Sequence, residues 1–85
     1  MRKRNLPTAT FQAITTEYFG PTDRRGARVI ARAQCGKVVV CWDHALSVDD
    51  NHATAAMALV ERMDWDGVWI GGALPSGTGN VYVRK

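Results

Sequence analysis

Short stretches of the chain alternate apolar and polar residues with a period of two, the pattern of half-buried β-strands. The clearest is ARVIARA, residues 27–33, which is followed by the turn QCGK and by a second apolar run, VVVCW. Two such runs joined by a short turn predict a β-hairpin. The enrichment in β-branched and aromatic residues predicts three further strands. These lie in residues 9–19, 68–72 and 80–85.

A period of three and four residues replaces the alternation after Ser47, and it predicts an amphipathic helix of about four turns. The helix should end near Asp64, because Gly67 follows closely. Ser47 precedes Asp50 by three residues, which resembles a capping box, and a second acid, Asp49, would favour the positive end of the helix dipole. The apolar stripe expected to face the core consists of Ala53, Ala56, Met57, Val60 and Met63.

The predicted order is therefore β-β-β-α-β-β, an α+β two-layer sandwich with a mostly antiparallel sheet and one helix packed on one face. The 85 residues, 46% of them hydrophobic, suffice for one small domain. We expect residues 1–8 to form a disordered basic tail and residues 9–85 to form the domain. Glycine and proline place loops in GPTDRRG, residues 20–26, and in ALPSGTG, residues 73–79.

Charge changes this picture only at the amino terminus. The net charge is +3, and without Arg2, Lys3 and Arg4 eight basic residues balance eight acidic ones. Cys35 and Cys41 are interpreted as reduced residues in or beside the hairpin, without a disulfide. The longest apolar run is far shorter than the ~20 residues that span a bilayer. We therefore expect a cytoplasmic protein without a membrane partner.

The strand alternation also predicts which side chains lie on the uncovered face of the sheet. If Val29 and Ala31 face the helix, and Val68, Ile70, Val81 and Val83 do so as well, the residues between them point outward. Arginine, tryptophan and tyrosine are enriched at binding hot spots, and they also serve as stacking platforms for nucleic acid. The predicted partner-binding residues are Arg24, Arg25, Arg28, Arg32, Trp69 and Tyr82, with Asp49 and Asp50 as a second candidate group. The same face could instead bury itself in a homodimer.

The stretch DHALSVDDNH, residues 43–52, offers an alternative chemistry, because it holds three aspartates and both histidines of the chain. Asp43, His44, Asp49 and His52 could converge on a metal ion. The two histidines are eight residues apart, however, whereas a zinc motif on a helix places them three or four apart. Helix capping explains the stretch better. The serines lack a G-x-S-x-G elbow, and GGALPSGTGN lacks the G-K-[ST] element of a phosphate loop. We predict neither a catalytic residue, a bound metal nor a cofactor, and hence no enzyme.

Three segments, YFGPT, DHAL…NHATAAMAL and GGALPSGTGNVYV, together resemble a family of small uncharacterised proteins encoded by phages, prophages and conjugative elements. The resemblance covers nearly the whole chain after Phe11, although the cysteines stand at positions not expected for the family. Proteins of this kind often act as stoichiometric inhibitors of host defence, anti-CRISPR proteins among them. The resemblance implies a non-enzymatic protein that binds a host protein or ribonucleoprotein defence complex. The alternative is a small nucleic-acid-binding accessory or regulatory protein.

Overall fold

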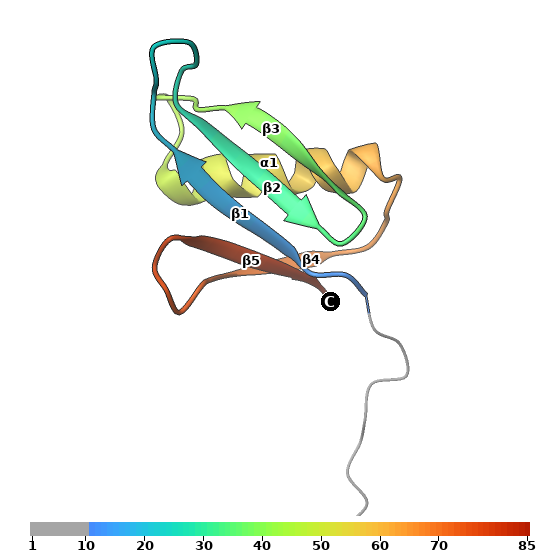
Figure 1. Ribbon diagram of the computed structural model, residues 1–85. Coiled ribbons are helices and arrows are strands. Elements are labelled where there is room, and N and C mark those ends of the chain that lie inside the picture. Colours follow the sequence, from blue (N-terminus) through green and yellow to red (C-terminus); the bar gives the residue numbers. More distant parts are fainter. Residues whose placement is uncertain (1–10) are drawn as a thin grey trace, which may run out of the picture.

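Five strands and one helix make up the computed structural model, which describes residues 11–85. The strands form one antiparallel sheet in the order β3-β2-β1-β5-β4, and the helix lies across one of its faces (Figure 1). This arrangement confirms the predicted α+β fold and the order β-β-β-α-β-β. The elements are β1 (Ile14–Phe19), β2 (Arg28–Ala33), β3 (Gly36–Cys41), α1 (Val48–Arg62), β4 (Trp69–Ala73) and β5 (Gly79–Arg84). The predicted basic tail, residues 1–8, lies outside the described residues.

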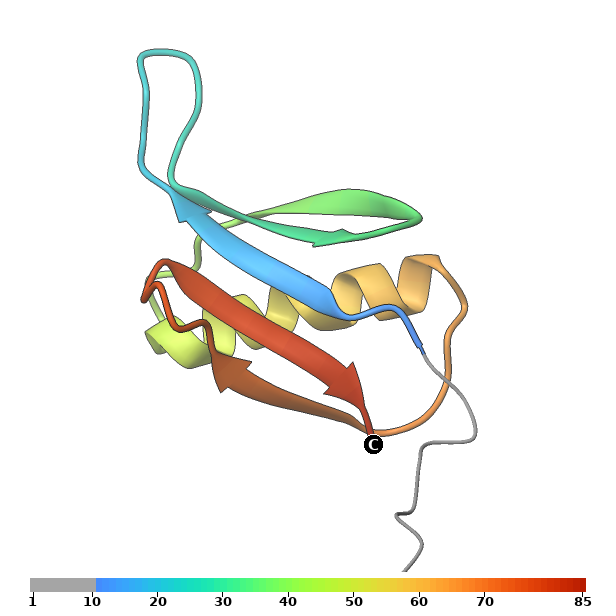
Figure 2. The same ribbon diagram turned by 60° about the horizontal axis from the view of Figure 1, so that its bottom comes forward.

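The first strand is the centre of the sheet, because β1 pairs with β2 on one side and with β5 on the other. Its regular pairing starts at Ile14, later than the start at residue 9 that the enrichment in β-branched and aromatic residues predicted. Gln34 and Cys35 form the tight turn of the predicted β2–β3 hairpin. Residues 20–27, between β1 and β2, project beyond the end of the sheet as a long loop (Figure 2). Because β1, β2 and β5 each have a neighbouring strand on both sides, β3 and β4 are the two edge strands.

The start of α1 explains the acidic and histidine-containing stretch. The Ser47 hydroxyl accepts a hydrogen bond from the backbone N–H of Asp50 at 3.1 Å, which confirms the predicted cap. Asn51 then ties the preceding loop to the helix: its amide oxygen accepts from the Asp43 N–H at 2.8 Å, and its amide nitrogen donates to the Asp43 carbonyl at 2.9 Å. Because Asn51 is buried, these bonds replace the water that the loop would otherwise need. The stretch therefore fixes where the helix begins.

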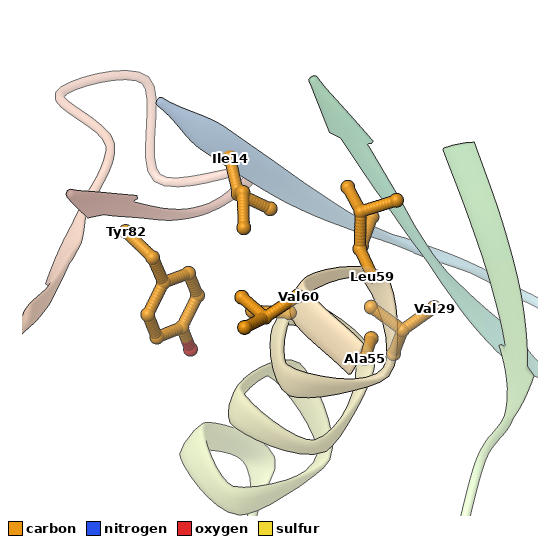
Figure 3. Packing of buried hydrophobic residues seen from close by; sticks show 8 residues of the cluster. Ile14, Val29, Ala55, Leu59, Val60 and Tyr82 are labelled. Atoms are coloured by element: carbon orange, nitrogen blue, oxygen red, sulfur yellow. The ribbon is translucent and has the colours of Figure 1, made fainter. Parts of the chain in front are cut away.

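The core lies between α1 and the sheet strands β1, β2, β3 and β5 (Figure 3). The predicted helix stripe is partly wrong. Met57 leaves 40% of its surface exposed, whereas Leu59 is fully buried. The sequence AAMALV is apolar at every position, so its periodicity did not determine which side of the helix faces the sheet. The buried apolar helix residues are Ala55, Ala56, Leu59 and Val60.

The predicted faces of β4 and β5 are inverted in the structure. Tyr82 is only 6% exposed, and its ring points toward α1 beside Val60 (Figure 3). Trp69 also packs against the core and does not point outward. The register explains the inversion, because Tyr82 pairs with Ile14, a core residue, and neighbours in register share a face. The apolar residues that alternate with these two aromatics, Val68, Ile70 and Val83, are exposed. For β2 the prediction was correct, since Val29 and Ala31 are buried under the helix.

Candidate binding surface

The sheet face opposite α1 is not covered by any other element among residues 11–85, and we refer to it as the open face (Figures 1 and 2). Strand alternation and register place its side chains. It carries Thr15, Glu17 and Phe19 from β1, Arg28, Ile30 and Arg32 from β2, Lys37, Val39 and Cys41 from β3, Ile70 from β4, and Val81 and Val83 from β5.

The cationic part of the open face is built around Phe19. The guanidinium of Arg28 lies 5.4 Å from the centre of the Phe19 ring, and that of Arg32 lies 5.9 Å from it. Arg32 also approaches the carboxylate of Glu17 at 3.9 Å, and Arg28 donates to the carbonyl of Gly26 at 3.4 Å. The cation–π contacts, the hydrogen bond of Arg28 and the ion pair of Arg32 restrict the two side chains, so less conformational entropy is lost when a partner binds them.

The loop of residues 20–27 adds two more arginines at the same end of the face. The N–H of Thr22 donates to the Arg25 carbonyl at 2.7 Å, and the Thr22 hydroxyl accepts from the Arg25 N–H at 3.1 Å. This turn leaves the side chains of Arg24 and Arg25 exposed. A hollow of about 300 Å³ lies between this loop and the strands β2 and β3. It is lined by Arg25, Gly26, Arg28, Val39 and Cys41.

The opposite end of the open face is aliphatic. Val68, Ile70 and Val83 are all exposed there, on and beside the β4–β5 hairpin. The open face is thus cationic toward the loop of residues 20–27 and apolar toward β4. Such a combination of arginines and exposed aliphatic side chains is typical of a surface that contacts another protein.

The predicted binding residues divide between the two sides of the sheet. The open face and its loop gather Arg24, Arg25, Arg28 and Arg32, in agreement with the alternation of β2. The aromatic pair, Trp69 and Tyr82, lies on the helix side, and the acidic pair, Asp49 and Asp50, is exposed in the first turn of α1. Sequence reasoning missed Phe19, Lys37, Val39, Ile70 and Val83. The pairing of β1 with β5, which places the last two, leaves no signal in a single sequence.

Two of the four residues considered for a metal ion have other hydrogen-bond partners. His52 is buried, and its Nδ1 lies 2.7 Å from the Thr16 hydroxyl. The Asp43 carboxylate accepts from the N–H of Ala45 at 2.9 Å. Among residues 11–85, no three histidine, cysteine, aspartate or glutamate side chains lie together in a way that could hold a metal ion. The structure therefore does not bring Asp43, His44, Asp49 and His52 together as ligands.

A hollow of about 640 Å³ lies between the start of α1 and the sheet. Its aromatic wall includes Tyr18 and Trp42, which meet edge to face at 4.9 Å. Two of its polar groups already have partners, because His52 bonds Thr16 and the Asn80 amide donates to the Tyr82 hydroxyl at 3.3 Å. These contacts make the side chains part of the packing between helix and sheet.

Burial gives His52 a measurable role in stability. Desolvation lowers the pKa of His52 below its usual 6.5, and the opposing charge of Asp49 offsets this only in part. The folded protein thus favours the neutral ring, and its contribution to stability is complete above the unfolded pKa. We expect the free energy of unfolding to fall as the pH decreases through 6.5 toward the lower folded pKa.

Urea denaturation at several pH values between 5 and 8 would measure this slope. His52→Gln should reduce it, and His44→Gln, at an exposed position, should leave it as in the parent. An equal dependence of the unfolding free energy on pH in the parent and in His52→Gln would contradict the assignment of this dependence to His52.

No family model, curated protein or solved structure matches this chain. The resemblance to proteins of phages and mobile elements consequently stays a prediction. The described part of the chain also contains no helix long and apolar enough to cross a membrane.

Proposed function

We propose that this protein is a non-enzymatic binding protein whose open face docks on an acidic, partly apolar surface of another protein. The observation that carries the proposal is the five-stranded sheet with one face uncovered, on which restrained arginines adjoin exposed aliphatic side chains. Following the resemblance stated above, we propose that the target is a host defence complex, which the protein inhibits stoichiometrically by occupying its surface.

The aromatic residues of the open face favour a protein target over nucleic acid. Base stacking requires an accessible aromatic ring. The aromatic ring that the open face carries, Phe19, lies under two guanidinium groups, and Trp69 and Tyr82 lie on the helix side. The exposed rings of Phe11 and Tyr18 line hollows away from the open face. A nucleic-acid-binding accessory protein remains the alternative, supported by the cluster of arginines and by the basic residues of the tail.

The first experiment is an affinity purification from host lysate, with and without nuclease, followed by mass spectrometry. A defence complex retained after nuclease treatment would then be purified and its Kd measured for matched charge variants. Arg25→Glu alters the open-face loop, and Arg62→Glu makes the same change of charge at an exposed position of α1. We expect Arg25→Glu to raise the Kd about ten-fold and Arg62→Glu to leave it nearly unchanged.

The nucleic-acid alternative gives a different result. Binding would be lost with nuclease and would weaken steeply with salt, because phosphate contacts release counterions. Both charge variants would then weaken binding to a similar extent, since each removes one cation. That outcome would contradict the proposed docking of the open face on a protein.

A further inference from the structure

The outer side of β4 is an unprotected sheet edge. Its five residues, WIGGA, contain neither a charge nor a proline. Natural proteins usually protect an edge strand with such residues, because its unpaired backbone groups can pair with another chain. β4 is the last strand of the sheet, and no other described segment pairs with its outer side.

The hydrogen bonds of the β4–β5 ladder show which backbone groups are free. The N–H of Lys85 donates to the Val68 carbonyl at 2.7 Å, and the N–H of Leu74 donates to the Gly79 carbonyl at 2.9 Å. Every second residue of an antiparallel strand bonds to the same neighbouring strand, so Ile70 and Gly72, which lie between Val68 and Leu74, also bond to β5 through their backbone groups. The outward groups therefore belong to Trp69, Gly71 and Ala73. They offer a regular row of donors and acceptors to an added strand.

One hollow lies beside this edge on the helix side, and a second lies at the end of the sheet where β4 begins. The first, of about 320 Å³, separates Asp49, Asp50 and Ala53 of α1 from residues 71–73 of β4. α1 packs mainly on β1, β2 and β3, and small residues form this part of the edge, so the space beside β4 stays open. The second hollow, of about 340 Å³, is found at the start of β4. It is lined by Phe11, Gln12, Asp64, Trp65, Asp66, Trp69 and Arg84.

The charges around both hollows select a basic occupant. Four carboxylates line them, and the single cation, Arg84, is already paired with Asp66 at 2.9 Å. The indoles of Trp65 and Trp69 stack with their centres 5.6 Å apart, which provides an aromatic wall for a cationic side chain. The Nε1 of Trp69 is buried and has no acceptor among the described residues.

We propose that the outer side of β4 binds an extended basic peptide segment of a partner protein, which adds to the sheet as a further strand. Side chains of the peptide that face α1 would lie about 7 Å apart along it. One basic side chain would lie beside Asp49 and Asp50, and another, farther along, would lie against Trp65 and Trp69 near Asp64. This inference does not depend on the open face, because it uses the opposite side of the sheet and its edge.

A second copy of this chain fits the same edge less well. Antiparallel pairing of two β4 strands around Gly71 would place the two helices on the same side of a continuous sheet, running in opposite directions. Asp49 and Asp50 of one copy would then face Asp64 and Asp66 of the other. Like charges placed opposite each other disfavour such an interface.

The test uses the full chain and a fluorescent peptide of alternating lysine and threonine, with a glutamate–threonine peptide as the control. Fluorescence anisotropy should detect binding of the lysine peptide alone. Asp49→Asn combined with Asp50→Asn should raise its Kd at least five-fold. Ala73→Pro removes an outward N–H without breaking the β4–β5 ladder, and it should raise the Kd at least ten-fold. The matched control is Val39→Pro, at an outward position of the other edge strand, which should leave the Kd unchanged.

Amide hydrogen exchange keeps the proposal testable even if a proline variant does not fold. The lysine peptide should slow exchange at Trp69, Gly71 and Ala73 at least ten-fold and leave Ile70 and Gly72 nearly unchanged. Absence of binding, or binding without this protection, would overturn the proposal. Protection of the same amides without peptide, accompanied by dimerisation in sedimentation, would also overturn it and assign the edge to a second copy.

Discussion

Replacing Leu59 with alanine should lower the free energy of unfolding by about 3 kcal/mol. Leu59 is fully buried at the centre of the packing between α1 and the sheet (Figure 3). The substitution removes most of its side chain and leaves a cavity that rigid neighbouring strands cannot fill. A domain of this size has a stability of only about 5 kcal/mol, so the variant should retain about 2 kcal/mol and unfold at a much lower urea concentration than the parent. Urea denaturation followed by tryptophan fluorescence would measure the difference.

The control for Leu59 is Met57, two positions earlier on the same helix. Met57 is 40% exposed, and Met57→Ala should cost less than about 1 kcal/mol. The helical stripe inferred from the sequence alone assigned Met57 to the core, so that Met57→Asp should have unfolded the protein. From the structure we expect Met57→Asp to remain folded. Equal losses for Leu59→Ala and Met57→Ala would show that α1 is rotated from the orientation described.

Replacing Tyr82 with alanine should also destabilise the domain by about 3 kcal/mol. The ring is buried between α1 and β4 and covers Gly71, where a Cβ atom would overlap it. Burial is also the main reason that the pKa of Tyr82 is raised above its usual 10.0. Tyr82→Phe keeps the ring and removes only the hydroxyl bonded by Asn80, so it should cost about 1 kcal/mol.

Val83 provides the control, because it is the next residue on β5 and is 47% exposed on the open face. Val83→Ala should change the free energy of unfolding by less than about 1 kcal/mol. Thermal and urea unfolding of the two variants would distinguish the faces of β5 directly. If Val83→Ala were the more destabilising, the faces would be reversed, and Tyr82 would return to the open face as a candidate contact.

Some features of the protein follow from neighbouring residues alone, and these could be predicted. The alternation of β2 and the tight turn at Gln34 and Cys35 define the first hairpin, because strand period and turn chemistry act over a few residues. Ser47 marks the start of α1 through a bond to a backbone group only three residues away. The arginine part of the candidate surface was predicted for the same reason, since Arg28 and Arg32 alternate with the buried Val29 and Ala31.

Other features depended on contacts between distant segments. Periodicity divides a strand into two faces, but it does not say which face meets the helix. The pairing of Ile14 with Tyr82, residues far apart in sequence, decided this for β5. The β4–β5 register then placed Trp69 on the same side of the sheet as Tyr82. The sequence also did not determine which side of α1 faces the sheet, because nearly every residue around Met57 is apolar. Only packing against the sheet places Leu59 in the core. The sequence by itself thus determined the order of the elements and the arginine strand, whereas the tertiary structure decided which apolar side chains are buried and which remain for a partner.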